Sequence, residues 1–292
     1  MATEKVRTLA PDAASTGSWC FEDFVVGQGF EAGPRRVTEA DLETFAAISG
    51  DHHPLHADPD FAARTRFDRP VLHGPFGLAV VFGLFHELGL VVGTEVALLD
   101  TMWTYRAPIY VGDALSMTMT ITRCRRGRDA TAGVVNRHVE LRNQAGEIVQ
   151  QGTTAFLVPA RTAGPDPVGL AFACPEWGVA LAAALNEDGR FGAAVASWDG
   201  TIGLRSGSDE IQLRVYRGRV LEAVRRTPAG PTFTLAASEL TWTELVTGPR
   251  NDFMRRVMLE EFTTTGNAYE YLRMTKALDL IVDAARRIGQ EC

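Results

Sequence analysis

The sequence predicts an α+β fold in two parts, and three observations support this. A stretch near residues 76–85 is too apolar for a surface helix, segments with strand patterns follow it, and a proline- and glycine-rich segment then precedes further strands and helices. An antiparallel sheet wrapped around one buried helix, followed by a smaller α+β domain, satisfies all three.

The composition is that of an ordinary globular protein. Hydrophobic residues make up 46% of the 292 positions, charged residues 22%, and the formal net charge is −7. Binding to nucleic acid or to an anionic membrane requires clustered Lys and Arg on a basic protein, so neither is expected. The four cysteines are scattered without metal-like spacing, which predicts reduced thiols and a cytoplasmic protein.

The break between the two parts is the segment 161–169, R-T-A-G-P-D-P-V-G. Two prolines, two glycines and few apolar side chains are typical of a linker. We therefore predict one domain over 20–160 and a second over 170–289, and we expect residues 1–18 to be a loose polar tail.

The first part opens with an extended segment, 29–37, and a helix that begins at Thr38. Thr38 and Asp41 have the spacing of a capping box, and Gly50 ends the helix. We expect a loop over 51–59, because its prolines interrupt regular helix. The apolar face of the helix is predicted to consist of Leu42, Phe45, Ala46 and Ile48.

The apolar helix follows Pro75, a residue that suits the first position of a helix. Because the segment is apolar on nearly every face, it has to be wrapped by other elements. The segment 115–122 alternates strictly between apolar and polar side chains, and 95–109, 130–142 and 147–158 also favour strands. A sheet curled around one apolar helix is the hot-dog architecture.

The second part reads as a helix over 175–185, then strands, then helices. Strands are expected near 201, over 211–215, 220–226 and 232–237, and everything after Ser238 is predicted to be helical. No acid/base pair stands out in this half of the sequence.

The candidate catalytic residues lie in the segment 49–59, S-G-D-H-H-P-L-H-A-D-P. Adding water to a carbon–carbon double bond beside a carbonyl requires one proton movement at the water oxygen and one at the α carbon. Asp51 and His56, held by two prolines, can supply both. The carbonyl oxygen also needs a donor, and Gly74 offers a backbone N–H at a helix start. Taken alone, such residues are more often turn and cap residues.

The segment 49–59, together with F-A at 61–62, Phe67 and P-V-L-H-G at 70–74, resembles the signature of MaoC-like dehydratases, the (R)-specific enoyl-CoA hydratases. The segment 105–113, Y-R-A-P-I-Y-V-G-D, is similar to a later segment of that family. The resemblance implies a hot-dog fold, a homodimer, and no cofactor beyond the coenzyme A or acyl-carrier thioester of the substrate. It also implies syn addition or removal of water at a 2-enoyl thioester, with Asp51 and His56 catalytic and the Gly74 amide in the oxyanion hole.

The sequence departs from the family at His53, where an asparagine is usual. Histidine is larger and can become charged, so the substrate, the pH dependence or the activity could differ. We nevertheless expect the substrate site to be lined by His53, His73, Pro75 and Phe76.

Histidine and carboxylate are also metal ligands, so a metal site at His52, His53, His56 and Asp58 is an alternative. Pro54 prevents His52 and His56 from facing one another across a helical turn, and we therefore expect no metal.

The second domain resembles, more diffusely, the sterol-carrier-protein-2-like fold, through W-D-G at 198–200, the segment 242–248 and G-N at 266–267. That likeness implies an apolar tunnel for a lipid or acyl ligand. The plainer interpretation is that Phe233, Leu235, Trp242 and Leu245 only fill a core.

Two alternatives to a hydratase remain open. One is a hot-dog thioesterase, which would release a free thiol. The other is a non-catalytic acyl- or lipid-binding protein whose hot-dog half has lost its activity.

Overall fold

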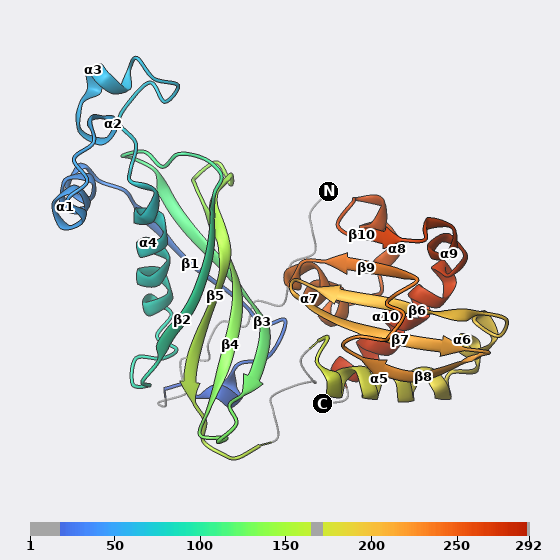
Figure 1. Ribbon diagram of the computed structural model, residues 1–292. Helices are drawn as coiled ribbons and strands as arrows, with labels where there is room; N and C mark the ends of the chain where they lie inside the picture. Colours follow the sequence, from blue (N-terminus) through green and yellow to red (C-terminus); the bar gives the residue numbers. More distant parts are fainter. Residues whose placement is uncertain (1–17, 165–171, 291–292) are drawn as a thin grey trace. The chain divides into compact units, whose positions relative to one another are not determined.

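The computed structural model describes residues 18–164 and 172–290, which form two compact units (Figure 1). The first unit contains most residues up to Ala163, and the second contains residues from Gly164 onward together with 25–27 and 122–126. The predicted tail before residue 18 and the part of the predicted linker from residue 165 lie outside the described residues. Both units combine helices with a sheet, so the α+β class is confirmed.

The first unit is built on one five-stranded sheet with the strand order β1-β3-β4-β5-β2. Strand β1 pairs antiparallel with β3, and β5 pairs antiparallel with both β4 and β2. The elements in chain order are η1 (Phe21–Asp23), β1 (Gly29–Arg36), α1 (Glu39–Ser49), α2 (Pro54–Ala57), α3 (Pro59–Ala62), α4 (Gly74–Glu87), β2 (Ala97–Tyr105), β3 (Ala114–Arg126), β4 (Ala132–Arg142) and β5 (Ile148–Pro159).

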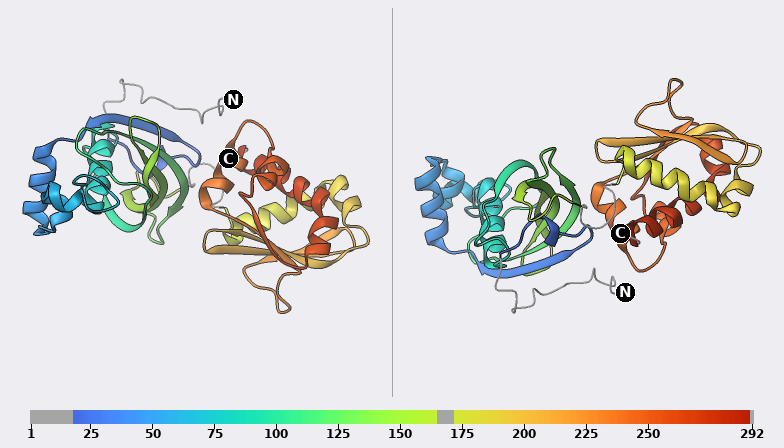
Figure 2. Two further views of the ribbon diagram at one scale, coloured as in Figure 1. Left: turned by 90° about the horizontal axis from the view of Figure 1, so that it is seen from above. Right: turned by 90° about the horizontal axis from the view of Figure 1, so that it is seen from below.

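Helix α4 lies against the inside of this curved sheet, as the end-on views show (Figure 2). It buries Phe76, Val80, Val81, Leu84 and Phe85, among others. The prediction that the helix is wrapped on every face is wrong for one stripe. Since a single sheet covers only one side of a helix, Pro75, Ala79 and Gly83 stay exposed.

Helix α1 has the predicted ends. Thr38 and Asp41 form the capping box, and Gly50 closes the helix with a φ of 71°. The predicted apolar face is only partly right, because Ile48 is 75% exposed and no residue of α1 is fully buried. Helices α1, α2 and α3 extend beyond the end of the sheet, where the strands do not cover them (Figure 1).

The predicted loop over 51–59 is wrong for most of its length, because α2 and the start of α3 occupy it. Pro54 and Pro59 each stand in the first turn of a short helix. The N–H groups in the first turn of a helix have no partner within the helix. Proline lacks this N–H, so it costs no hydrogen bond there and can begin a helix, whereas in the middle of a helix it interrupts one.

The second unit contains a sheet with the strand order β10-β9-β6-β7-β8. Helices α5 and α10 lie on one face of it (Figure 2). The elements are α5 (Pro175–Glu187), α6 (Gly189–Ala194), β6 (Asp199–Ser206), β7 (Asp209–Tyr216), β8 (Arg219–Val224), β9 (Phe233–Ala237), α7 (Glu239–Thr247), α8 (Phe253–Met258), β10 (Thr263–Gly266), α9 (Ala268–Arg273) and α10 (Thr275–Gln290). Strand β10 corrects the prediction that everything after Ser238 is helical.

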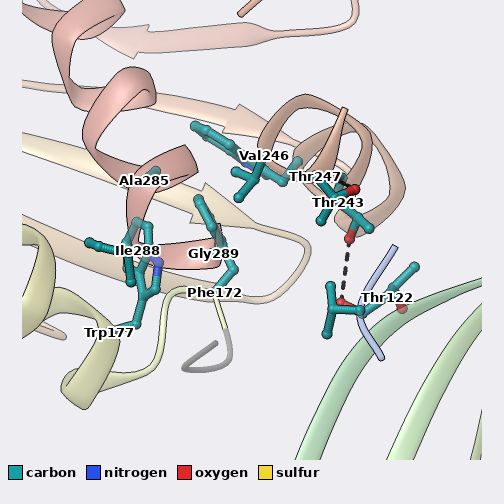
Figure 3. A pocket seen from close by; sticks show the side chains of 11 residues that line it. Thr122, Phe172, Trp177, Thr243, Val246, Thr247, Ala285, Ile288 and Gly289 are labelled. Carbon is teal, nitrogen blue, oxygen red and sulfur yellow. Dashed lines mark hydrogen bonds between the residues drawn. The ribbon is translucent and has the colours of Figure 1, made fainter. Parts of the chain in front are cut away.

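The four residues that we expected to fill a core in this unit do so. Phe233, Leu235, Trp242 and Leu245 are each at most 1% exposed and belong to one apolar cluster. Aromatic and aliphatic side chains, among them Trp177, Val246 and Ile288, also line a small hollow beside α7 and α10 (Figure 3). Among the described residues, no helix is both long and apolar enough to cross a membrane.

One buried charge stands out in the first unit. Arg137 on β4 is 2% exposed, and its guanidinium lies 4.0 Å from the ring centre of Phe85 and 4.6 Å from that of Phe156. It donates a hydrogen bond to Thr154 Oγ1 at 2.6 Å. Burial lowers the pKa of Arg137 to about 10, because the charged form is poorly solvated there. Below that pH the buried charge opposes folding, and the two aromatic rings offset only part of the cost.

Replacing Arg137 with Met should therefore stabilise the protein at pH 7, by about 1–3 kcal/mol in the free energy of unfolding. Urea denaturation of Arg137→Met beside the wild type measures this. Arg142→Met, at the more exposed end of the same strand, is the control and should change stability little. A clear loss of stability in Arg137→Met would mean that the aromatic rings and Thr154 more than compensate for the buried charge.

Candidate active site

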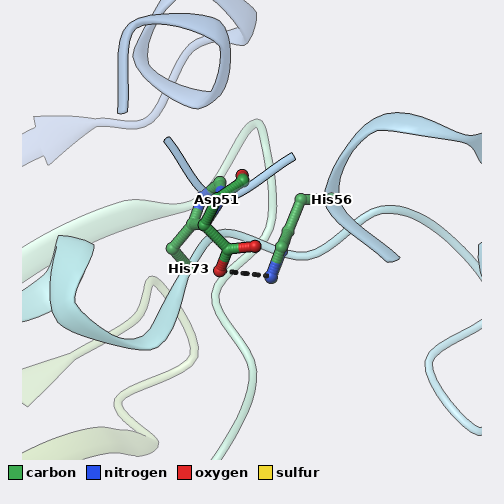
Figure 4. A group of neighbouring side chains, drawn as sticks. All are labelled: Asp51, His56 and His73. Atoms are coloured by element: carbon green, nitrogen blue, oxygen red, sulfur yellow. Dashed lines mark hydrogen bonds and ion pairs between the residues drawn. The ribbon is translucent and has the colours of Figure 1, made fainter. Parts of the chain in front are cut away.

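Asp51 and His56 face one another at the entrance to α2 (Figure 4). The Asp51 Oδ2 and His56 Nε2 atoms are 3.9 Å apart, and the Asp51 side chain is 53% exposed whereas that of His56 is only 13% exposed. The imidazole is thus held in the protein while the carboxylate remains open to solvent. A separation of 3.9 Å leaves both groups within reach of one small molecule between them.

The hydrogen bond made by Nδ1 determines which tautomer His56 adopts. His56 Nδ1 lies 2.7 Å from the carbonyl oxygen of Val71. A carbonyl oxygen can only accept, so Nδ1 carries the hydrogen and donates it. In the neutral ring Nε2 then has the lone pair, and this is the nitrogen that faces Asp51. Nε2 is thus the ring atom that can gain or lose a proton beside the carboxylate.

His73 supports this pair from beneath. It is 2% exposed, and its ring stacks on that of His56 with 3.8 Å between ring centres. His73 Nε2 lies 2.8 Å from the Asp51 carbonyl oxygen and, by the same argument, donates to it. Its buried Nδ1 has no hydrogen-bond partner among the described residues. The side chain that we expected to line the substrate site therefore lies below the acid/base pair and braces it.

The pKa of Asp51 is held below its ordinary value. The main cause is the His53 N–H, which donates to Asp51 Oδ1 at 3.2 Å, and nearby imidazoles add to it while partial desolvation opposes it. Asp51 is therefore a carboxylate at neutral pH. In that form it can accept a proton or stabilise a positive charge on His56.

The side chain of His53 has a local structural task. Its Nδ1 accepts the N–H of Leu55 at 3.1 Å and so caps α2, the helix that carries His56. Its ring also packs edge-on against Phe61, with 5.7 Å between ring centres. An asparagine side chain can cap a helix in the same way, which is a physical reason for either residue to occur here.

The alternative metal cluster of His52, His53, His56 and Asp58 is not assembled. His53 caps α2, and Asp58 caps α3 by accepting the N–H groups of Asp60 and Phe61. Instead, Asp51, His56 and His73 bring one potential ligand atom each within 4.8 Å of one another. The rings of His56 and His73 are stacked, with 24° between their planes.

Gly74 is the first residue of α4, directly after His73. No described residue accepts a hydrogen bond from its N–H, as is usual in the first turn of a helix. The Tyr105 ring lies over its α carbon, where a Cβ atom would be 3.2 Å from Tyr105 Cε1. Of the other predicted substrate contacts, Pro75 is exposed, whereas Phe76 is 5% exposed and packs against Phe45.

Two residues near this site could not be predicted from the sequence. Gln150 on β5 donates from Nε2 to the Gly74 carbonyl oxygen at 2.9 Å, and Trp103 on β2 donates from Nε1 to Gln150 Oε1 at 2.8 Å. Both belong to strands distant in the sequence from 51–74. Nothing local distinguishes this glutamine from the adjacent Gln151.

Part of the first unit matches a known family and is similar to known proteins. A family model described as "MaoC like domain" matches residues 23–143. The (R)-specific enoyl-CoA hydratase of Aeromonas caviae is 34% identical over 91 residues, which are 31% of this chain and 66% of that protein. The enzyme of the same name from Rhodospirillum rubrum is 28% identical over 146 residues, 48% of this chain and 92% of that protein.

For the second unit, a crystal structure of sterol carrier protein 2 aligns with 39% of this chain and 97% of that chain, at 21% identity and a TM-score of 0.35. The lipid or acyl tunnel implied by the sequence resemblance stays a prediction. For the first unit, the motif between residues 49 and 74, the antiparallel sheet around α4 and the family match point the same way. Residues 23–143 of this chain are a MaoC-like domain.

Proposed function

We propose that this chain is a hydro-lyase that adds water to, or removes it from, a 2-enoyl thioester, with Asp51 and His56 as the acid/base pair. The observation that carries the proposal is the oriented pair itself. A carboxylate whose pKa is lowered faces, at 3.9 Å, the nitrogen of an imidazole whose other nitrogen is held by a backbone carbonyl. The relatives named as (R)-specific enoyl-CoA hydratases support the same reaction class.

In the hydration direction, the water oxygen bonds to C3 of the enoyl thioester as Asp51 accepts a proton from that water. The π electrons of the double bond move toward the thioester oxygen, which the Gly74 N–H stabilises. His56, protonated at Nε2, delivers a proton to C2, and Asp51 afterwards returns a proton to His56. Dehydration is the reverse sequence. Because both groups lie on one side of the site, water is added syn.

The substrate carries its own activating group, so the proposal needs no resident cofactor. The thioester of coenzyme A or of an acyl carrier protein makes C2 acidic, and the protein supplies orientation and proton transfer. The thioesterase alternative would release a free thiol, and the non-catalytic lipid-binding alternative would form no product, so one assay separates the two from a hydratase.

Asp51→Asn and His56→Ala should each lower kcat for hydration of crotonyl-CoA at least about 100-fold, because each removes one of the two proton movements. Loss of absorbance of the enoyl thioester measures the rate. Asp60→Asn, an exposed carboxylate at the start of α3, is the matched control and should keep wild-type activity.

The same reactions should be followed with a thiol reagent. A hydratase leaves the thioester intact, so no free thiol is expected. Release of thiol without loss of the enoyl group would support the thioesterase alternative. A folded wild type that leaves every enoyl thioester unchanged would support the non-catalytic alternative.

His53→Asn should preserve stability and hydratase activity, because asparagine can keep the cap on α2. The free energy of unfolding and the activation free energy obtained from kcat/KM should each change by no more than about 0.5 kcal/mol. His53→Ala removes the cap and should lower the stability of the protein by about 1 kcal/mol. Thermal unfolding and kcat/KM measure the two effects. A large loss of activity in His53→Asn with normal stability would instead assign His53 a direct part in binding or chemistry.

We also propose that the chain forms a homodimer through strand β2. Strand β2 is at one edge of the first sheet, and large apolar side chains on it are exposed: Leu98 and Leu99 at 53%, Met102 at 70% and Tyr105 at 53%. An edge strand with exposed apolar side chains would promote aggregation unless another chain covers it. A second copy of the same chain satisfies this requirement with closed symmetry.

Met102→Asp should therefore shift the protein from dimer to monomer in light scattering coupled to gel filtration. Arg36→Asp, on the opposite edge strand β1, is the control and should leave the mass unchanged. A wild-type mass equal to one chain, or a dimer unaffected by Met102→Asp, would contradict an interface at β2.

A further inference from the structure

The Gln150 side chain connects the sheet to the first turn of α4. It is 2% exposed, donates from Nε2 to the Gly74 carbonyl oxygen at 2.9 Å and accepts the Trp103 indole N–H on Oε1 at 2.8 Å. An indole nitrogen can only donate. The amide oxygen therefore has to face Trp103, and the amide nitrogen is left facing Gly74. Trp103 thus fixes which end of the amide reaches the helix.

Two glycines make room for this connection. A Cβ atom on Gly77, one helical turn after Gly74, would collide with the Gln150 amide. A Cβ atom on Gly152, which pairs with Trp103 across the sheet, would collide with the Met102 carbonyl oxygen and the Trp103 ring. Glycine at 77 lets Gln150 cross the helix to reach Gly74, and glycine at 152 lets Trp103 lie across β5 toward Gln150. Four residues from three elements therefore serve one contact with the Gly74 carbonyl.

We propose that Gln150 is a positioning residue for the Gly74 amide, the donor that stabilises the thioester oxygen in the proposed function, on which this inference rests. A glycine in the first turn of a helix has a mobile backbone, because it lacks a side chain and its N–H has no partner within the helix. Gln150 holds the carbonyl side of Gly74. On the other side, His73 is tied to the Asp51 carbonyl at 2.8 Å.

The consequence is that Gln150 acts on catalysis without touching the substrate. An oxyanion donor stabilises the transition state only when it already points at the developing charge. With Gln150 absent, the Gly74 N–H still exists but is no longer held in one direction. The loss should therefore appear in kcat more than in KM, and in how strongly a bound thioester carbonyl is polarised.

The test uses the full chain, four single variants and the double variant of Gln150→Leu with Gly77→Ala. Gln150→Leu removes both hydrogen bonds at similar size, Gly77→Ala displaces the Gln150 side chain, and Trp103→Phe removes only the indole donor. Gln151→Leu, on the same strand, is the matched control. The readouts are kcat and KM for crotonyl-CoA hydration, and the absorption of bound 4-(dimethylamino)cinnamoyl-CoA, which moves to longer wavelength as its carbonyl is polarised.

We expect Gln150→Leu and Gly77→Ala each to lower kcat about tenfold with little change in KM and to reduce the wavelength shift of the bound probe. The double variant should be no worse than the single ones, since both break the same contact. Trp103→Phe should give a smaller effect in the same direction and provides the test if a larger change prevents folding. Gln151→Leu should match the wild type.

Folded Gln150→Leu and Trp103→Phe proteins with wild-type kcat and probe spectrum would overturn the role of Gln150 while leaving the hydratase function intact. A wild-type protein that neither hydrates crotonyl-CoA nor shifts the probe would overturn the proposed function, and this inference would fall with it.

Discussion

The hydrogen bond from His73 Nε2 to the Asp51 carbonyl joins two segments that lie 22 residues apart in the sequence. His73 is the last residue before α4, and Asp51 precedes α2. This one bond therefore sets the position of the acid/base pair relative to the Gly74 amide. The same imidazole stacks on His56, so a single buried side chain contacts the segment of each proposed catalytic group.

The precision of the site comes from the sheet and α4, because short segments such as α2 and α3 could not hold the geometry alone. Helix α4 is anchored by its buried apolar side chains, and its first turn receives Gln150 from β5. His56 is tied to the segment before α4 through the Val71 carbonyl. The proposed acid/base pair thus lies on short segments that hydrogen bonds connect to the packed sheet and α4. Such an arrangement orients reacting groups before the substrate binds.

The sequence predicted those elements of the fold that depend on residues close together in the chain, such as helix ends and alternating strands. Thr38, Asp41 and Gly50 determined both ends of α1, because a cap depends on residues within one turn. The alternation over 115–122 predicted β3 for the same reason. Strand β10 was missed because its four residues are all exposed and carry no alternating burial. Ile48 was misplaced because helical periodicity gives a face but not what covers it.

The sequence predicted site residues between 51 and 76 but none of those on the strands. Asp51 and His56 could be paired because they lie five positions apart. Gln150 and Trp103 are 47 residues apart, and Gln150 is 76 residues from Gly74, so only the register of β2 and β5 and the packing of α4 bring them together. The hydrogen bond between His73 and Asp51 likewise depends on how the chain folds, because the two residues lie 22 positions apart. The sequence therefore predicted the two groups that we propose as proton carriers, but not the strand residues that contact the site.

The stereochemistry of hydration tests the central claim most directly. Crotonyl-CoA should be hydrated in D₂O, and the configuration at C2 and C3 of the 3-hydroxybutyryl product determined by NMR and chiral analysis. We expect deuterium and oxygen to be added to the same face of the double bond, because Asp51 and His56 act from one side, and the relatives named as (R)-specific hydratases lead us to expect the (R)-3-hydroxy product. Addition of deuterium and oxygen to opposite faces would contradict a site in which this pair moves both protons.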